Sequence, residues 1–303
     1  MEKTLCGYVA LVGAPNAGKS TLMNRIVGAK LSIVSPKVQT TRSRVLGILV
    51  EGLSQLIFVD TPGIFEPKKR LERAMVAAAW AGAQDADQVV LLVDAGRRID
   101  DDTRRIIEGL KRAGRQAVLA LNKIDLVDPK KLLGLTEELS KEGIFERVFM
   151  ISGLTGSGVD DLKNYLAASM PEGPWLFPED QLSDMPQRLL ASEVTREQMF
   201  LQLHDELPYA STVETESWEE KPDGSARITQ VVYVRRDSQK AIVLGQGGQQ
   251  IKRIGARARQ ELEKMMERRI HLFLFVKVRD DWQENRERYE AMGLEFDPKD
   301  SGT

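Results

Sequence analysis

The residues with the clearest chemical potential form a glycine-rich run near the start of the chain. Residues 13–20 read Gly-Ala-Pro-Asn-Ala-Gly-Lys-Ser and fit the pattern G-x-x-x-x-G-K-[ST]. A loop of this kind turns successive backbone N–H groups toward a polyphosphate. Lys19 is then expected against the β- and γ-phosphates, and the Ser20 hydroxyl against Mg²⁺. The pattern also fits a chance turn before a helix, so the rest of the chain must decide between them.

A second candidate run is Asp60-Thr61-Pro62-Gly63. A carboxylate there can hold Mg²⁺ through a bound water, and a glycine amide can face a terminal phosphate. When that phosphate leaves, the following loop can change shape. The run also fits an ordinary turn. Residue 64 is isoleucine, so no glutamine is present there to orient an attacking water, and intrinsic turnover is expected to be slow.

The run Asn122-Lys123-Ile124-Asp125 carries the chemistry for selecting a base. The Asp125 carboxylate can accept hydrogen bonds from N1–H and the exocyclic N2 amine of guanine, whereas adenine presents an unprotonated ring nitrogen and no amine at these positions. A polar group left unpaired by the wrong base rejects that base by about 10⁴ in favourable cases. Lys123 is expected to lay its methylene stem over the base, and Asn122 to brace the loops. A backbone contact to the base oxygen is expected from Ser152-Gly153-Leu154.

A different chemistry is indicated by Gly245-Gln246-Gly247-Gly248, which has the form G-x-x-G. Such a loop lets the backbone approach about four nucleotides of a single strand, with basic residues neutralising phosphates. Lys252 and Arg253 lie one turn later. By itself the pattern is also an ordinary tight turn.

The distribution of charge supports the nucleic-acid interpretation. Residues 226–279 contain 13 Lys and Arg against 4 Asp and Glu, whereas the remaining residues contain 30 against 41. A strongly basic region in an otherwise acidic chain is expected of a module that binds a polyanion. A solvated charged face is the alternative for charge taken by itself.

The elements that must position these residues follow two patterns. Up to about Met170, short apolar runs alternate with helical patterns. The expected strands are residues 8–12, 45–50, 55–60, 88–94, 117–122 and 148–152, and the expected helices are 19–27, 70–83, 101–113, 129–142 and 159–170. Alternation predicts an α/β domain with a mainly parallel sheet and helices on both faces. The pair around Glu51-Gly52 is spaced too closely for a crossover and predicts a hairpin. Ligands bind such sheets at the carboxyl ends of strands, where each candidate run lies.

A proline-rich segment, residues 171–186, follows this pattern and reads as a linker. Beyond it we expect a helix over 187–207, a hairpin of 212–218 with 227–235, a strand at 241–244, helices at 249–254 and 256–268, and a strand at 270–278. The predicted organisation is a first domain at 1–172, a linker at 173–186, an α+β domain at 187–280 and a tail at 281–303.

Composition excludes several other classes of protein. The 303 residues include one cysteine, Cys6, and two histidines, which argues against an internal disulfide and a zinc cage. The sequence lacks an apolar stretch near the ~20 residues that span a bilayer, and its start does not resemble a signal peptide. A cytoplasmic protein is expected.

The runs at residues 13–20, 60–63, 122–125 and 152–154 together resemble those of the translation-factor-related P-loop GTPases, in the branch that contains the Era, Der and MnmE families. The resemblance implies GTP and GDP as ligands, Mg²⁺ as cofactor, and a first switch over about residues 31–44. Within it, Thr41 is expected to close on Mg²⁺ and the γ-phosphate, with Thr40 as the alternative. Asn16 resembles the asparagine that helps relatives hold potassium in place of an arginine finger, so K⁺ is a further expected cofactor.

The order of elements around 245–248 resembles a type II KH domain. A GTPase domain followed by a KH domain resembles the Era family, bacterial GTPases of small-subunit ribosome assembly. Two further stretches agree: residues 193–197 with 206–210 resemble the family's junction helix, and residues 276–278 with Trp282 resemble its last strand and tail. One departure is that Gln246 and Gly247 are uncharged where relatives often have a lysine.

The resemblance implies binding near the 3′ end of small-subunit ribosomal RNA, controlled by the GTP state. It also implies the small ribosomal subunit as partner, a monomer, and peripheral association with the inner membrane. A hypothesis from another class is an RNA-binding or membrane-associated scaffold whose nucleotide site is structural. An unrelated NTPase is opposed by Asp125.

The residues expected to contact the nucleotide are Gly13, Ala14, Pro15, Asn16, Ala17, Gly18, Lys19, Ser20, Thr21, Asp60, Thr61, Pro62, Gly63, Asn122, Lys123, Ile124, Asp125, Ser152, Gly153 and Leu154. Those expected to take part in catalysis are Lys19, Thr41, Asn16 and Gly63. The expected metal ligands are Ser20, Thr41 and Asp60. The expected RNA contacts are Gly245, Gln246, Gly247, Gly248, Lys252 and Arg253.

Overall fold

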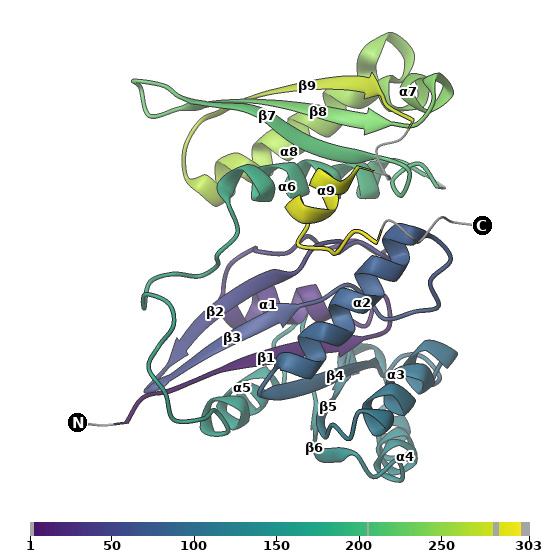
Figure 1. Ribbon diagram of the computed structural model, residues 1–303, viewed down its shortest axis with the longest axis vertical. Helices are drawn as coiled ribbons and strands as arrows, with labels where there is room; N and C mark the ends of the chain where they lie inside the picture. Colours follow the sequence, from purple (N-terminus) through teal and green to yellow (C-terminus); the bar gives the residue numbers. More distant parts are fainter. Residues whose placement is uncertain (1–2, 205, 281–284, 298–303) are drawn as a thin grey trace. The chain divides into compact units, whose positions relative to one another are not determined.

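The structure is a computed structural model that describes residues 3–204, 206–280 and 285–297 (Figure 1). It divides into two compact units, the first comprising residues 1–32, 41–184 and 292–303 and the second residues 33–40 and 185–291. Trp282 and the last six residues of the predicted tail lie outside the described residues. The predicted functional boundaries at 172, 187 and 280 stay predictions.

In the described part of the first unit, six strands form one sheet in the order β2-β3-β1-β4-β5-β6. They are β1 (Leu5–Gly13), β2 (Val45–Glu51), β3 (Ser54–Asp60), β4 (Gln88–Asp94), β5 (Ala117–Asn122) and β6 (Phe145–Met150). β2 and β3 form the predicted antiparallel hairpin, and the other neighbours are parallel. The carboxyl ends of β1, β3, β4 and β5 therefore lie along one edge.

Helices cover both faces of this sheet, as predicted (Figure 1). α1 (Lys19–Val27) and α5 (Val159–Ala168) pack on one face, against β3. α2 (Arg70–Asp85), α3 (Asp101–Arg112) and α4 (Pro129–Ser140) join β1, β4 and β5 in a core cluster on the other. Two of these helices begin with capping residues that are typical of helix N-termini. The Asp100 side chain accepts from Thr103 N–H at the start of α3, and Asp128 does the same for Lys130 N–H at the start of α4, whose first residue is proline.

The proline-rich segment is fixed to the first unit up to residue 184. Fully buried Gln55 on β3 donates to the Phe177 carbonyl (2.7 Å) and accepts from the N–H groups of Leu176 and Phe177. The Ile48 N–H of β2 donates to the Leu182 carbonyl at 2.9 Å. Prolines prevent regular structure here, and hydrogen bonds to the Gln55 side chain and to the backbone of β2 hold the segment instead.

The second unit has the element order α6-β7-β8-α7-α8-β9-α9. These are α6 (Gln187–Gln202), β7 (Thr212–Glu220), β8 (Ala226–Val234), α7 (Asp237–Leu244), α8 (Gln249–Met266), β9 (Ile270–Val278) and α9 (Arg286–Ala291). The described strands form a sheet in the order β7-β8-β9, with β8 and β9 parallel. α6 and α8 pack on one face of it, over a core that includes Val232, Ile254 and Val276.

Several predicted elements of the chain are wrong in type or length. The strand expected at 241–244 is the second half of helix α7. Within this apolar run only Val243 is buried, while Ala241 and Ile242 are exposed, so the run does not form a buried strand. The two helices expected at 249–254 and 256–268 are one helix, α8, which continues through Gly255. α6 ends at Gln202 rather than 207, and β6 begins and ends earlier than the predicted 148–152.

Candidate nucleotide site and nucleic-acid loop

The glycine-rich run connects the end of β1 to the start of α1 and folds around Lys19. The Lys19 side chain is buried, and its Nζ donates to the carbonyl oxygens of Gly13 (3.0 Å) and Ala14 (3.1 Å). Ser20 and Thr21 complete the first helical turn. Gly18 has φ +99°, and a Cβ on it would lie 2.3 Å from Asn122 Nδ2. The loop therefore requires glycine at position 18 for both its conformation and its close approach to Asn122.

Burial changes the protonation of Lys19. It lowers the pKa of the Lys19 ammonium from 10.5 to about 8, and the charge of Asp60 acts in the opposite direction. Phosphate oxygens in this loop would replace two neutral carbonyls with negative charge and raise the pKa again. Nucleotide binding is therefore linked to protonation of Lys19.

Three oxygen-bearing side chains meet at the end of β3. Asp60 is fully buried, and its Oδ2 accepts from the Ser20 hydroxyl at 2.6 Å. The hydroxyls of Ser20 and Thr41 lie 3.0 Å apart. Burial raises the pKa of the Asp60 carboxyl, and the hydroxyl hydrogen bonds and the charge of Lys19 oppose that rise. Asp60 Oδ1 is buried without a hydrogen-bond partner among the described residues.

These residues fit Mg²⁺. Two hydroxyls and one carboxylate are the hard oxygen donors that Mg²⁺ prefers, and few protein ligands suffice because it keeps several waters. The buried, unpaired Asp60 Oδ1 is an electrostatic cost that a cation or its water would remove. Thr41, rather than Thr40, reaches this cluster, since the Thr40 hydroxyl donates to the Lys37 carbonyl at 2.8 Å.

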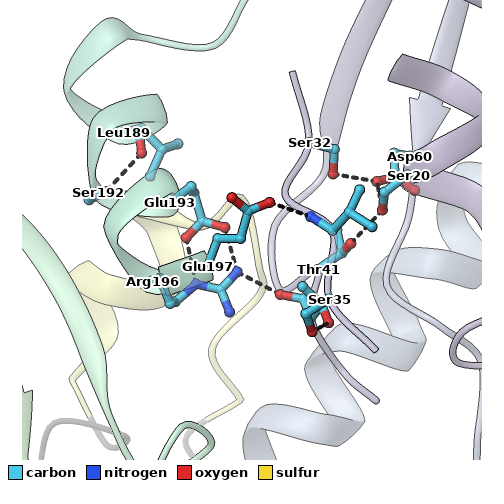
Figure 2. Close-up of polar contacts among 12 residues, drawn as sticks. Ser20, Ser32, Ser35, Thr41, Asp60, Leu189, Ser192, Glu193, Arg196 and Glu197 are labelled. Atoms are coloured by element: carbon cyan, nitrogen blue, oxygen red, sulfur yellow. Dashed lines mark hydrogen bonds and ion pairs between the residues drawn. The ribbon is translucent and has the colours of Figure 1, made fainter. Parts of the chain in front are cut away.

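Ser32 is a member of this cluster that sequence reasoning missed. Its hydroxyl donates to Asp60 Oδ2 at 2.6 Å (Figure 2). Asn24 on α1 holds the segment in place, since its Oδ1 accepts from the N–H groups of Leu31 and Ser32, both at 2.9 Å. A serine in a loop carries no sequence signal for such a role.

The run at residues 60–63 rests on the phosphate loop. The Thr61 hydroxyl donates to the Leu11 carbonyl (2.9 Å), and a Cβ on Gly63 would approach Pro15 at 3.0 Å. Ile64 is fully buried, and its N–H donates to the Gly13 carbonyl at 3.2 Å. The Ile64 side chain thus belongs to the core and does not face the nucleotide site.

The candidate base-binding loops meet at Asn122. Its Nδ2 donates to the Ala17 carbonyl (2.8 Å), and its Oδ1 accepts from Gly153 N–H (2.9 Å). This one amide ties the phosphate loop to the loop after β6, the bracing that the sequence predicts. Asp125 lies in the short helix η1 (Ile124–Leu126) with its side chain exposed, where it can meet a ligand.

The neighbouring residues complete this end of the site. Lys123 Nζ forms an ion pair with Asp94 Oδ2 at 2.6 Å. The sequence predictions gave Asp94 no role in the site, although it ends β4 in the same way that Asp60 ends β3. Ser152 is buried and Leu154 is exposed, and the Arg25 guanidinium donates to the carbonyls of Gly153 and Leu154.

Residues 33–40, in the middle of the predicted first switch, belong to the second unit. They contact α6 through two buried charged side chains (Figure 2). Glu197 Oε1 accepts from Val34 N–H at 2.9 Å, and the Arg196 guanidinium donates to the Thr40 carbonyl at 2.6 Å. Arg196 is itself fixed by an ion pair with Glu193. Lys37 Nζ also donates to the Leu203 carbonyl at the end of α6.

The G-x-x-G loop lies between α7 and α8 and includes the short helix η2 (Gln246–Gly248). Gly247 and Gly248 have φ +59° and +75°, and nothing lies within 4 Å of a Cβ built on either, so their backbone faces open space. Lys252 and Arg253 are exposed in the first turns of α8. The structure thus brings together the open backbone and the charge that the RNA prediction requires, with the charge on the following helix.

Comparison with known proteins agrees with both units. A family model described as "50S ribosome-binding GTPase" matches residues 8–123, and a KH domain model matches residues 206–283. The chain is 58% identical over 293 residues to GTPase Era of Rhizobium meliloti (strain 1021), and 56% identical over 294 residues to that of Brucella suis biovar 1 (strain 1330). Both alignments cover 97% of this chain and 94% of the relative.

Two solved structures are similar over 96% of this chain, each with a TM-score of 0.90 and 38% identity. One is an Era variant from Aquifex aeolicus bound to GDP·AlF₄⁻. The other is Era in complex with MgGDPNP and nucleotides 1506–1542 of 16S ribosomal RNA. Each alignment covers 99% of the solved chain.

The fold and the site define a P-loop GTPase with a type II KH domain, as the sequence predicts. The length and level of the similarity then fix the family. The chain belongs to the Era family of GTPases.

Proposed function

We propose that this GTPase binds small-subunit ribosomal RNA near its 3′ end through the KH domain and that its GTP state controls this binding. One observation carries the control. In the candidate Mg²⁺ site, the hydroxyl oxygen of Thr41 lies 3.0 Å from that of Ser20. The carbonyl of the preceding residue, Thr40, accepts a hydrogen bond from Arg196 of α6. The carbonyl that Arg196 holds belongs to the peptide bond between Thr40 and Thr41, so a movement of Thr41 that depends on the nucleotide would be passed to α6 through this hydrogen bond.

The chemistry at the nucleotide site rests mainly on electrostatics. Ser20, Thr41 and Asp60 would hold Mg²⁺, which neutralises charge that develops on the phosphates. Lys19, once a phosphate has raised its pKa, adds a fixed positive charge. Asp125 selects guanine, and Asn122 keeps the base loop and the phosphate loop in register. Residue 64 is an isoleucine that packs in the core, so this position supplies no glutamine side chain to orient the attacking water. Turnover is therefore slow.

We also propose K⁺ as a cofactor of hydrolysis. Asn16 has φ +65°, so the loop adopts a left-handed turn at this residue, which asparagine tolerates well. Asn16 belongs to the glycine-rich loop between β1 and α1, and its amide oxygen is a ligand that a monovalent cation accepts. The roles of the remaining nucleotide, metal and RNA residues named from the sequence are part of the same proposal.

The setting we propose is the cytoplasm, with a monomeric chain that acts on the small ribosomal subunit and also makes peripheral contact with the inner membrane. No helix among the described residues is both long and apolar enough to cross a membrane. Co-sedimentation with small subunits tests the partner, analytical ultracentrifugation tests the monomer, and vesicle flotation tests the membrane contact.

The central test compares RNA affinity in the two nucleotide states. A fluorescent single-stranded RNA with the 3′-terminal sequence of small-subunit ribosomal RNA is titrated with the full chain loaded with GDP or with a non-hydrolysable GTP analogue. The proposal expects affinities that differ by at least about fivefold, or about 1 kcal/mol of coupling. Equal affinities, together with the absence of multiple-turnover hydrolysis, would favour the scaffold hypothesis.

A further inference from the structure

One face of strand β9 carries a row of side chains that neither the nucleotide site nor the G-x-x-G loop uses. The strand ladder extends one residue beyond each end of β9, because the Arg269 carbonyl accepts from Ala226 N–H and Arg279 N–H donates to the Val234 carbonyl. Side chains two apart on a strand share a face. The odd-numbered residues on this face are Arg269, His271, Phe273, Phe275, Lys277 and Arg279.

This face points away from α6 and α8, while Arg288 of α9 lies over the Tyr233 ring, beside Lys277 in the register, at 4.5 Å from the ring centre. The even-numbered residues Leu272, Leu274 and Val276 pack in the core with α6 and α8. Phe273 and Phe275, in contrast, are 44% and 54% exposed. Leaving two neighbouring phenyl rings of an open sheet face in water is unfavourable in free energy, and such exposed apolar surface is typical of a binding site.

The two rings have the spacing of an extended nucleic-acid strand. Residues i and i+2 of a strand lie about 7 Å apart, and aromatic pairs on open sheets stack two or three bases in other RNA-binding folds. Phe273 already has the Arg227 guanidinium 5.0 Å from its ring centre. Thr229 and Val231 of β8 lie beside the two phenylalanines in the register. Bases could therefore stack along β9 with phosphates near the cations at either end.

The charges on this face favour a polyanion. The carboxylates that β7 brings to it are paired, Glu214 with Arg288, Glu216 with Lys277 and Glu219 with Lys221. Asp223, in the hairpin turn, accepts hydrogen bonds from the N–H and the hydroxyl of Ser225. Arg227 lies opposite Glu219 in the β7–β8 register, where its charge adds to the hydrogen bond from Lys221 in lowering the pKa of that carboxyl. Arg269 and Arg279, in contrast, form no ion pair with a carboxylate in the part of the chain that the structure describes.

We propose that Phe273, Phe275 and Arg227 form a stacking platform for a second stretch of single-stranded RNA. The inference rests on the proposed RNA-binding function and adds a surface on the sheet face opposite α6 and α8. The basic and aromatic row fits this ligand better than a second copy of the chain. Two-fold pairing of β9 edges would place Arg269 beside the partner's Arg279, and like charges oppose that contact.

The test uses the full chain and two fluorescein-labelled RNAs of about 6 and about 20 nucleotides, since one G-x-x-G loop contacts about four. Removing both rings in Phe273→Ala/Phe275→Ala is expected to weaken binding of the longer RNA about 25-fold, at about fivefold per stacked base. Binding of the shorter RNA should change less than about twofold. Leu201→Ala, another residue with an exposed apolar side chain (48%), is the matched control and should leave both affinities unchanged.

Two further measurements separate the outcomes. Photocrosslinking of 4-thiouridine in the longer RNA should label residues 270–279 in the wild type. Circular dichroism and GTP hydrolysis confirm that the double variant is folded. If the wild type binds neither RNA, the proposed RNA function itself fails. If the wild type binds and the double variant binds the longer RNA equally well, the platform is overturned while the RNA function stands. A change in self-association with no change in RNA affinity would also overturn it.

Discussion

The Arg196 guanidinium donates to the Thr40 carbonyl oxygen at 2.6 Å, and both residues belong to the same compact unit. The next residue, Thr41, belongs to the other unit and lies beside Ser20. Arg196 is 1% exposed and its Nη1 has no hydrogen-bond partner among the described residues. A buried guanidinium that is incompletely paired is costly, and the ion pair with Glu193 and the hydrogen bond to Thr40 offset part of that cost.

Weakening the hold on the switch segment should uncouple nucleotide state from RNA affinity. In Glu197→Ala, Val34 N–H loses its acceptor, and in Arg196→Ala the Thr40 carbonyl loses its donor. We expect the ratio of RNA affinities in the GTP-analogue and GDP states to fall toward one in both, measured by fluorescence anisotropy. Arg196→Ala should also lower the free energy of unfolding by about 3 kcal/mol, because it leaves Glu193 without its partner.

Two matched variants complete this comparison. Glu197→Gln keeps an oxygen that can accept from Val34, so it should preserve more of the coupling than Glu197→Ala. Arg188→Ala removes an exposed arginine from the same helix and should change neither stability nor coupling. An affinity ratio in Glu197→Ala equal to that of the wild type would contradict the proposed route.

The lowered pKa of Lys19 predicts proton uptake when nucleotide binds. The buried ammonium has a pKa of about 8, and phosphate contact raises it. Binding of GDP at pH 8 should therefore take up about half a proton, rising toward one at pH 9 and falling to about a tenth at pH 7. Calorimetry in two buffers with different ionisation enthalpies measures this uptake. Asp60→Asn removes the second titrating group of the site, so the uptake should persist in that background.

The same shift has a consequence for stability, with a definite sign. The folded-state pKa lies below the unfolded value of 10.5, so the unfolded chain binds more protons between pH 8 and 10.5. This residue's contribution to the free energy of unfolding of the nucleotide-free protein therefore rises with pH across that window.

Absence of any proton uptake on GDP binding at pH 8 to 9 would show that Lys19 is already fully charged.

Strand ends were the part of the site that sequence could locate. Asp60 and Asn122 end buried apolar runs, and the same rule applied to the strand ending at Asp94 would have found the partner of Lys123. Ser32 could not be found, since its position depends on hydrogen bonds that the N–H groups of Leu31 and Ser32 donate to the Asn24 side chain. Arg196 and Glu197 were equally hidden. Every residue from 194 to 200 is buried, so no polar stripe marks which charges face a partner.

Gly18→Ala should disrupt nucleotide binding through Asn122. The new methyl group would lie 2.3 Å from Asn122 Nδ2, at a φ of +99° that alanine disfavours. Displacing Asn122 breaks its hydrogen bonds to Ala17 and Gly153. We expect GDP affinity to fall by at least about 100-fold, or about 3 kcal/mol, by fluorescence titration.

Gly28→Ala is the matched control for this clash. Gly28 ends α1 with φ +76°, but nothing lies within 4 Å of a Cβ built there. It should lower stability by about 1 kcal/mol from backbone strain and leave GDP affinity within about twofold. If both variants lose affinity equally, strain in general and not the Asn122 contact is responsible.

Potassium should accelerate hydrolysis, and Asn16 should be required for that effect. The wild type is expected to turn over GTP at least about tenfold faster in KCl than in NaCl of equal ionic strength, since a cation beside the phosphates stabilises developing charge. Asn16→Ala should reduce the ratio to about one, with rates followed by phosphate release. Equal rates of the wild type in the two salts would remove K⁺ from the proposed mechanism.

Asp125→Asn should change which base the site accepts. The exposed carboxylate in η1 can accept two hydrogen bonds from guanine, and an amide replaces one acceptor with a donor. Xanthine carries an oxygen where guanine carries its amine, so it can accept from that donor. We expect GTP affinity to fall by about 10³-fold or more and xanthosine triphosphate to bind in its place. Asp128→Asn, three residues later, preserves the cap of α4 because asparagine is an equally good capping residue, and it should bind GTP as the wild type does. A variant at 125 that loses all nucleotides alike would mean that Asp125 supports the loop rather than reads the base.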